Sequence, residues 1–181
     1  YESGGDPGAI GYDSTGGYSY GTYQLAHSNA QPFVNQSKYA PQFAGLKFNS
    51  PQWRQKWQDI AKQDPQGFDA AQKSFIQQTH FQPQAKKLAA AGFDFKKYSG
   101  VLADVIWSTA VQHGPGTGII ANIVRQFGNS LSEAQLIKKI YEARWGGGSQ
   151  FASSTPAVKN SVYTRFFGKD GILGLTKTFF Y

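Results

Sequence analysis

The chain contains no cysteine and no methionine among its 181 residues. The missing cysteine excludes disulfides and thiolate metal sites, and His27, His80 and His113 are too scattered to suggest a zinc motif, so no metal and no cofactor is expected. No apolar run approaches the roughly 18 residues that span a bilayer, and no signal-peptide pattern is present, so we expect no membrane insertion. Because the chain begins at Tyr1, we expect it to be a fragment of a longer protein.

Basic residues are absent from the start of the chain. Residues 1–37 contain three acidic side chains and no lysine or arginine, whereas residues 38–181 contain eighteen basic and eight acidic ones. A basic body favours an anionic partner, such as bacterial cell-wall polymers, a lipid surface or nucleic acid. The lysines are dispersed and no recognition motif appears, so nucleic acid is not the expected partner. The acidic start indicates a place for chemistry within a basic protein.

The composition, with 40% apolar and 15% aromatic residues, is that of a folded domain, which we expect to cover residues 1–181 and to be monomeric. Residues 9–13 and 18–23 alternate like the strands of a hairpin, and a loop containing Pro32 and Pro41 follows. Residues 101–111 are apolar on nearly every side, which predicts a buried central helix. Helical spacing and caps predict the remaining helices at residues 51–63, 68–81, 83–91, 119–127, 132–145 and 158–167. The predicted class is α+β, mostly helical, with one early β-hairpin.

Two early carboxylates suit the cleavage of a glycosidic bond. That reaction needs an acid to protonate the leaving oxygen, and commonly a second carboxylate that activates water or stabilises the transition state. Glu2 and Asp13 lie eleven residues apart in the acidic segment and are the candidate catalytic pair. Asp13 has an equally plausible use as a turn residue whose side chain caps Ser14, Thr15 and Gly16.

Two motifs resemble those of the lysozyme superfamily of peptidoglycan glycosidases. Glu2-Ser3 is followed by Gly21-Thr22-Tyr23-Gln24, similar to the "ES" and "GLMQ" of lytic transglycosylases, and residues 110–116 (AVQHGPG) resemble their "AYNAGPG". The resemblance implies a lysozyme-like fold with Glu2 as general acid, Thr22 and Gln24 lining the substrate site, and Gln112 near the glutamate. The sequence "GTYQ" is closest to the muramidase-like domains of type VI secretion spike and phage tail proteins.

Further substrate contacts are expected from residues near these motifs. Tyr20 belongs to a row of hairpin tyrosines of which some should face the substrate, because only one face of a hairpin is buried. His113 is a candidate donor, although a histidine at a helix end is as often bonded to local carbonyls. Val111 replaces a tyrosine of the family motif, and Tyr163 is the candidate to supply that contact.

The resulting hypothesis is a muramidase that cleaves the β-1,4 bond between N-acetylmuramic acid and N-acetylglucosamine, acting as an antibacterial effector or phage lysin. A lytic transglycosylase or chitosanase-like glycosidase is the enzymatic alternative, and a glycan-binding module is the alternative without catalysis. The expected partners are peptidoglycan glycan strands and a cognate immunity or inhibitor protein. We expect secretion, or delivery to the periplasm or cell wall of a target bacterium.

Overall fold

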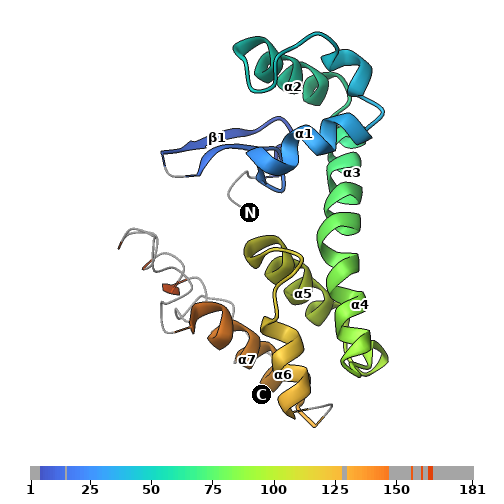
Figure 1. The fold of residues 1–181 in the computed structure, drawn as a ribbon, viewed down its shortest axis with the longest axis vertical. Helices are drawn as coiled ribbons and strands as arrows, with labels where there is room; N and C mark the ends of the chain where they lie inside the picture. The colour runs from blue at the N-terminus through green and yellow to red at the C-terminus, as the bar shows by residue number, and fades with distance from the viewer. Residues whose placement is uncertain are drawn as a thin grey trace. The chain divides into compact units, whose positions relative to one another are not determined.

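The computed structural model describes residues 5–14, 16–127 and 130–146, together with residues 156, 160, 163 and 164 (Figure 1). The chain forms two compact units, the first ending at Gln78 and the second beginning at Thr79. Most of the predicted helix at residues 158–167 lies outside the described residues, as does Glu2. The expectation of a single domain over residues 1–181 stays a prediction.

The first unit combines a small antiparallel sheet with helices, drawn from blue to green in Figure 1. The described strands follow the order β1-β2-β3 in the sheet, with β1 at Ile10–Asp13, β2 at Gly17–Tyr20 and β3 at Leu25–Ala26. The predicted hairpin is therefore confirmed, and β3 adds a strand that the sequence did not indicate. The helical elements are α1 (His27–Gln36), the 3-10 helix η1 (Ala40–Phe43), α2 (Pro51–Gln63) and α3 (Pro65–Ile76).

Aromatic rings fill the core of the first unit. Trp57 and Phe68 are fully buried, with ring centroids 4.7 Å apart, and Trp53 stacks on Trp57 at 5.6 Å. Phe33 of α1 reaches the same cluster, 5.5 Å from Trp57. Trp53 and Trp57 are thus core residues, as their helical spacing predicts, and this core holds α1, α2 and α3 together.

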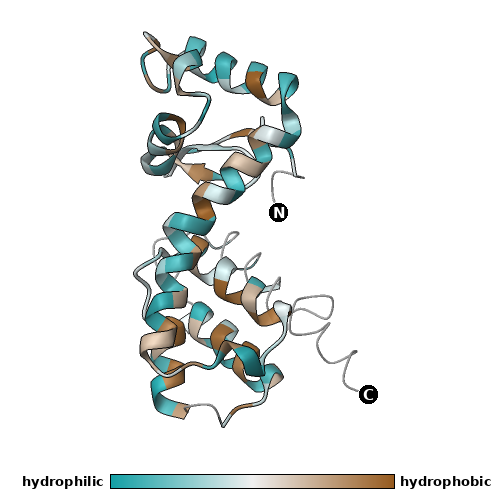
Figure 2. Cartoon of the chain, turned by 90° about the vertical axis from the view of Figure 1, so that its right-hand side faces the viewer, coloured by the Kyte–Doolittle hydropathy of each residue, from teal (hydrophilic) through white to brown (hydrophobic). Residues whose placement is uncertain are grey.

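The regular elements among the described residues of the second unit are all helices. The π-helical segment η2 (Gln77–Phe81) crosses the boundary between the units, and the following elements are α4 (Gln82–Ala90), η3 (Phe95–Lys97), α5 (Gly100–His113), α6 (Ile119–Phe127) and α7 (Glu133–Trp145). Their buried side chains form one core, which includes Leu88, Leu102, Ile106, Ile120, Val124, Ile137 and Ile140. Most helices show both brown and teal stretches in Figure 2, as amphipathic helices do. The mostly helical α+β class is therefore confirmed.

The predicted buried helix is α5. Leu102, Ile106 and Ala110 are at most 1% exposed and belong to the core, whereas Val101 at the start of the helix is 58% exposed. The helix is therefore buried along one side. Despite its apolar sequence α5 has only 14 residues, and none of the helices that the structure describes is long and apolar enough to cross a membrane.

Local capping signals correctly located two helices. Ser50 accepts a hydrogen bond from the backbone N–H of Trp53 and so caps α2, which begins at Pro51 as predicted. Ser132 and Gln135 form a capping box at the start of α7, in which each side chain accepts from the backbone N–H of the other. Gly146 ends α7 in the left-handed conformation.

The expected loop around Pro32 is wrong, because residues 27–36 form α1. This helix has no side-chain cap at its start and carries Pro32 in its interior, where proline removes one backbone hydrogen bond. Its stability comes instead from burying Ala30, Phe33 and Val34 in the aromatic core. The second half of the expected loop contains η1, whose Phe43 is also buried.

The helix predicted from Phe68 begins earlier in the structure and continues without a break into the next helix. The backbone remains helical from Pro65 to Ala90, because α3 passes through the π-helical residues 77–81 directly into α4. The start moves from Phe68 to Pro65 because Asp64 caps α3 through the backbone N–H of Gly67, at 3.0 Å. The helix predicted from Pro83 is confirmed as α4, which begins one residue earlier at Gln82 and has Pro83 in its first turn, where a missing N–H is tolerated.

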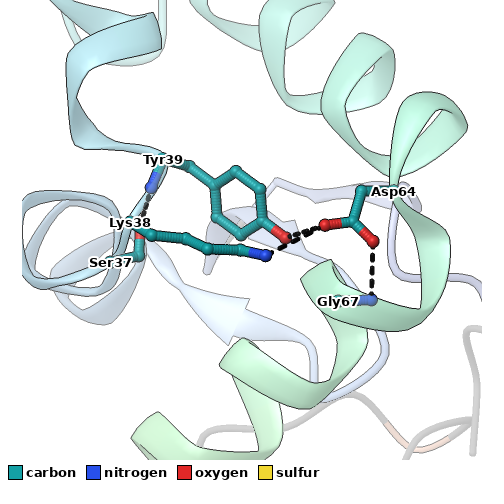
Figure 3. Close-up of polar contacts among 5 residues, drawn as sticks. All are labelled: Ser37, Lys38, Tyr39, Asp64 and Gly67. Carbon is teal, nitrogen blue, oxygen red and sulfur yellow. Dashed lines mark hydrogen bonds and ion pairs between the residues drawn. The ribbon is translucent and has the colours of Figure 1, made fainter.

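The Asp64 carboxylate also ties α3 to the segment after α1 (Figure 3). Its Oδ2 accepts hydrogen bonds from the Tyr39 hydroxyl at 2.8 Å and from the Lys38 ammonium at 3.1 Å. These two bonds, with the bond from the Gly67 N–H, hold the pKa of Asp64 below its ordinary value. Gly67 suits this contact because a Cβ there would lie 2.3 Å from the carboxylate.

We expect Asp64→Ala to lower the unfolding temperature at pH 7, because it removes the cap of α3 and the partner of Tyr39. Since the folded pKa of Asp64 is the lowered one, its charge stabilises the fold above the ordinary value of 3.8, and this contribution is lost as the pH falls through the folded pKa. Circular dichroism melts between pH 7 and pH 2 should therefore show the difference between variant and parent shrinking in acid. Asp59→Ala, whose carboxylate only accepts a bond from Gln55 one turn away, should have little effect.

Candidate functional site

The "GTYQ" sequence forms a turn directly after β2. Gly21 and Gln24 have positive φ angles of 71° and 50°, and the backbone N–H of Gln24 donates to the Gly21 carbonyl at 3.1 Å. The Gln24 side chain closes the turn a second time, since its Nε2 donates to the same carbonyl at 3.0 Å. Its Oε1 accepts from the Ser19 hydroxyl at 2.7 Å. Gln24 is therefore held rigidly at the edge of the sheet.

The buried Gln72 side chain joins this turn to the segment that follows Glu2. Gln72 lies on α3 and is 0% exposed. Its Oε1 accepts from the backbone N–H of Thr22 at 3.1 Å, and its Nε2 donates to the carbonyl of Pro7 at 3.0 Å. The indole of Trp57 donates to that same carbonyl, also at 3.0 Å. Two helices thus anchor Pro7, and one of them also anchors Thr22.

Thr22 contacts α3 through its side chain as well. Its hydroxyl donates to the Asp69 carboxylate at 2.6 Å, one turn of helix before Gln72. Sequence reasoning missed both Asp69 and Gln72. Gln72 could have been identified from the sequence, because its spacing places it on the buried side of α3 with Phe68 and Phe75. A polar side chain in such a position must find hydrogen-bond partners.

The register of the hairpin separates two chemically different faces. Opposed residues of an antiparallel pair point to the same side, and Tyr12 pairs with Tyr18 as Ile10 pairs with Tyr20. This face is aromatic. Gly11 pairs with Ser19 on the other face, where the Ser19 hydroxyl bonds Gln24. The second face is therefore small and polar, and it continues into the "GTYQ" turn.

The structure corrects the expectation that Tyr20 binds substrate. Tyr20 is 0% exposed, packs its ring 5.1 Å from Trp53 and 5.2 Å from Trp57, and donates its hydroxyl to Asn49 Oδ1 at 2.5 Å. Burial raises the pKa of Tyr20 to about 12. The face of the hairpin that carries Tyr20 packs against Trp53 and Trp57 of α2. Tyr20 is a core residue and not a substrate contact.

Asp13 lies at the exposed end of β1. Its Oδ1 accepts a hydrogen bond from the backbone N–H of Gly16 at 2.7 Å. This bond is the turn-building use that the sequence allowed as an alternative. Asp6 likewise builds a turn, accepting from the N–H of Gly8 at 2.7 Å.

In the second unit, Gln112 and His113 end α5. Gln112 is exposed, and its Oε1 accepts a hydrogen bond from Arg144 of α7, which is only 3% exposed and also donates to Ser108 at 3.1 Å. Burial, and after it the charge of Arg144, lower the pKa of His113, which is therefore neutral at pH 7. An open hollow of about 460 Å³ lies beside His113, lined also by Thr117, Gly118, Ile119, Asn122, Ile123, Gln126 and Ala143.

Tyr163 is 49% exposed, with its ring 5.4 Å from that of Trp145. The two sequence motifs fall in different units, with Thr22 and Gln24 in the first and Gln112 and His113 in the second. A common substrate site for both motifs therefore stays a prediction.

Among the residues with described positions, no group of three or more histidine or carboxylate side chains could hold a metal ion.

Comparison with known proteins places the chain in a family. A model of the family described as "Type VI secretion system spike protein VgrG3-like, C-terminal" matches residues 1–169. The chain belongs to this family. It is 33% identical over 163 residues to the type VI secretion system spike protein VgrG3 of Vibrio cholerae serotype O1 (strain ATCC 39315 / El Tor Inaba N16961), a match that covers 87% of this chain and 16% of that protein.

The chain thus spans about one sixth of the length of this curated relative. The VgrG3-like match begins before Glu2 and ends after Tyr163, so every candidate site residue falls inside it. The family assignment agrees with the resemblance of "GTYQ" to domains of type VI secretion spike proteins.

The contact between Gly21 and Gln72 predicts an unusually damaging substitution. A Cβ at Gly21 would lie 2.0 Å from the Gln72 Oε1, in addition to the strain of a positive φ angle. Gly45 has a similar φ of 75° with nothing within 4 Å, so Gly45→Ala is the matched control and should cost roughly 1–2 kcal/mol in the free energy of unfolding. Gly21→Ala should cost about 1–3 kcal/mol more, because it also displaces Gln72. Urea unfolding of both variants measures the difference, and equal losses would contradict the anchoring role of Gln72.

Proposed function

We propose that this chain is a muramidase that cleaves the β-1,4 bond between N-acetylmuramic acid and N-acetylglucosamine in peptidoglycan. Glu2 acts as the general acid that protonates the leaving oxygen. Thr22 and Gln24 bind the glycan next to the scissile bond, and Gln112, His113 and Tyr163 contribute contacts from the second unit.

The observation that carries this proposal is the double anchoring of Pro7 and Thr22 by Gln72. Pro7 lies five positions after Glu2 in the sequence, and five residue steps span at most about 18 Å. The contacts of Gln72 with Pro7 and Thr22 therefore limit how far Glu2 can lie from the "GTYQ" turn. A general acid must be fixed relative to the groups that hold its substrate, because small errors of placement reduce the rate steeply. The buried amide supports such a placement.

The distribution of charge favours an anionic glycan. Residues 1–78 carry six acidic and six basic side chains and so have no net charge, whereas residues 79–181 carry twelve basic and five acidic ones, a net charge of +7. The second unit therefore attracts the anionic polymers of a cell wall. Chitosan is a polycation and would be repelled, which argues against a chitosanase.

Lytic transglycosylation is the second candidate, and the hydrogen bond of Asp13 favours it. The Asp13 carboxylate already serves the hairpin turn by accepting from Gly16. A lytic transglycosylase needs only one catalytic carboxylate, because a hydroxyl of the sugar itself closes the 1,6-anhydro ring in place of water. This candidate keeps Glu2 as the acid and gives Asp13 a structural role alone.

Family membership supports a biological setting for this activity. As the C-terminal part of a type VI secretion spike protein, the domain would act as an antibacterial effector that is delivered to the periplasm of a target cell. A producing cell that makes such an effector needs protection from it, so a cognate immunity protein is the proposed protein partner.

Glu2→Gln tests the catalytic acid. The amide keeps the shape of the side chain but has no proton to give, so release of soluble fragments from purified peptidoglycan should fall about 100- to 10,000-fold. The circular dichroism spectrum and the unfolding temperature should match those of the parent. Full activity in Glu2→Gln would reject Glu2 as the acid, and no activity in either protein would favour a glycan-binding module.

Asp13→Asn separates the two enzymatic candidates. Asparagine also accepts a hydrogen bond through its side-chain oxygen, so the turn bond to Gly16 is retained while the charge is removed. A muramidase that uses Asp13 to activate water should lose about 100-fold or more in rate and should release reducing ends. Near-parent activity together with 1,6-anhydromuramic ends, detected by mass spectrometry of the digest, would identify a lytic transglycosylase instead.

A further inference from the structure

The aromatic face of the hairpin continues from the core to the solvent. Tyr20 is fully buried against Trp53 and Trp57, Tyr18 is half-buried, and Tyr12 is 69% exposed. The rings are neighbours along this row, with centroids 6.3 Å apart for Tyr18 and Tyr20 and 4.9 Å apart for Tyr12 and Tyr18. Tyr12 is thus a large exposed ring on a support that is fixed in the core.

A cation is held against the same row. The guanidinium of Arg54, on α2, lies 4.5 Å from the ring centroid of Tyr18. Asn49 fixes it there, because Arg54 Nη1 donates to the Asn49 carbonyl at 2.6 Å and to its Oδ1 at 3.2 Å. Asn49 Oδ1 is also the acceptor for the Tyr20 hydroxyl, so the cation and the ring row share one support. Neither ion pair found among the described residues involves Arg54.

We propose that Tyr12, Tyr18 and Arg54 form a glycan-binding platform, separate from the polar face that carries Gln24. Tyr12 packs against the C–H face of one sugar ring of a β-1,4-linked N-acetyl sugar strand. Arg54 binds a carboxylate borne by that strand or by its attached peptide. The platform holds the insoluble wall close to the protein, so it is a binding site and not a part of the cleavage chemistry.

The chemistry of the platform favours this ligand. The electron-rich face of a tyrosine ring packs well against the C–H groups of a pyranose, and tyrosine supplies this area with few rotatable bonds. A guanidinium stacked on an aromatic ring is weakly hydrated and matches the geometry of a carboxylate. A nucleic acid would require several phosphates to be neutralised, and the first unit has no net positive charge to do so. The choice of ligand rests on the proposed function.

The test is a binding measurement in the Glu2→Gln background, so that cleavage does not remove the ligand. Co-sedimentation with purified peptidoglycan sacculi should show an affinity about 3- to 10-fold weaker for Tyr12→Ala, whereas Tyr12→Phe, which keeps the ring, should bind like the parent. Val101→Ala is the matched control, because Val101 is 58% exposed in the second unit and should not affect binding. Arg54→Gln should weaken binding to sacculi but not to chitohexaose, a neutral N-acetylglucosamine hexamer.

The outcomes separate this platform from the proposed function. Unchanged binding of sacculi by Tyr12→Ala would overturn the platform, even if the parent protein that keeps Glu2 releases peptidoglycan fragments. The exposed ring of Tyr12 would then be assigned to contact with a protein partner. Equal loss of sacculi and chitohexaose binding in Arg54→Gln would overturn the role of its charge. Binding that depends on Tyr12, together with no release of fragments by the parent protein that keeps Glu2, would support the platform and reject the muramidase.

Discussion

The first unit depends on one buried primary amide. Gln72 has no exposed surface, and a buried amide with an unmet hydrogen bond is strongly unfavourable, so both ends of its side chain must keep their partners. The Oε1 end fixes the backbone of Thr22, and the Nε2 end fixes that of Pro7. Trp57 bonds the same Pro7 carbonyl from α2, so Pro7 is fixed against two helices at once. Gly21 must remain glycine because its missing side chain leaves the space that Gln72 fills. A catalytic role for Glu2 would rely on this arrangement.

Packing of the hairpin against the aromatic core of the first unit makes its two faces chemically different. Tyr20 is buried by α2, and the next pair along the same face of the hairpin, Tyr12 with Tyr18, continues the aromatic face into solvent. The other side is left to Gly11, Ser19 and the amide of Gln24. A single short sheet therefore offers a polar surface suited to hydrogen bonds with a sugar and an aromatic surface suited to stacking. The first is the side proposed for cleavage and the second the side proposed for holding the wall.

Charge is divided along the chain in a way that composition alone did not reveal. The net charge of +7 belongs entirely to residues 79–181, while residues 1–78 are neutral. The unit that contains the "GTYQ" turn therefore has little long-range attraction for an anionic polymer, and recognition there must come from short contacts. Recruitment over the distance of a Debye length, about 8–10 Å, falls to the second unit. In the proposed function, the second unit would thus attract the anionic wall and short contacts in the first unit would select the bond.

The sequence by itself determined the features whose causes lie within a few residues. Ser50 with Pro51 set the start of α2, Ser132 with Gln135 set that of α7, and strand alternation defined the hairpin, because caps and pleats act locally. The sequence also carried the two motifs that resemble those of lysozyme-superfamily glycosidases. Only the tertiary structure decided the rest. The helix α1 has no cap and contains Pro32, so it exists because Phe33 and Val34 find a core made by distant residues. Tyr20 is buried because Trp53 and Trp57 of α2 pack against it, whereas Tyr12 of the same face remains exposed. The role of Gln72 depends on Pro7, sixty-five positions away. Such contacts join residues that no local pattern connects.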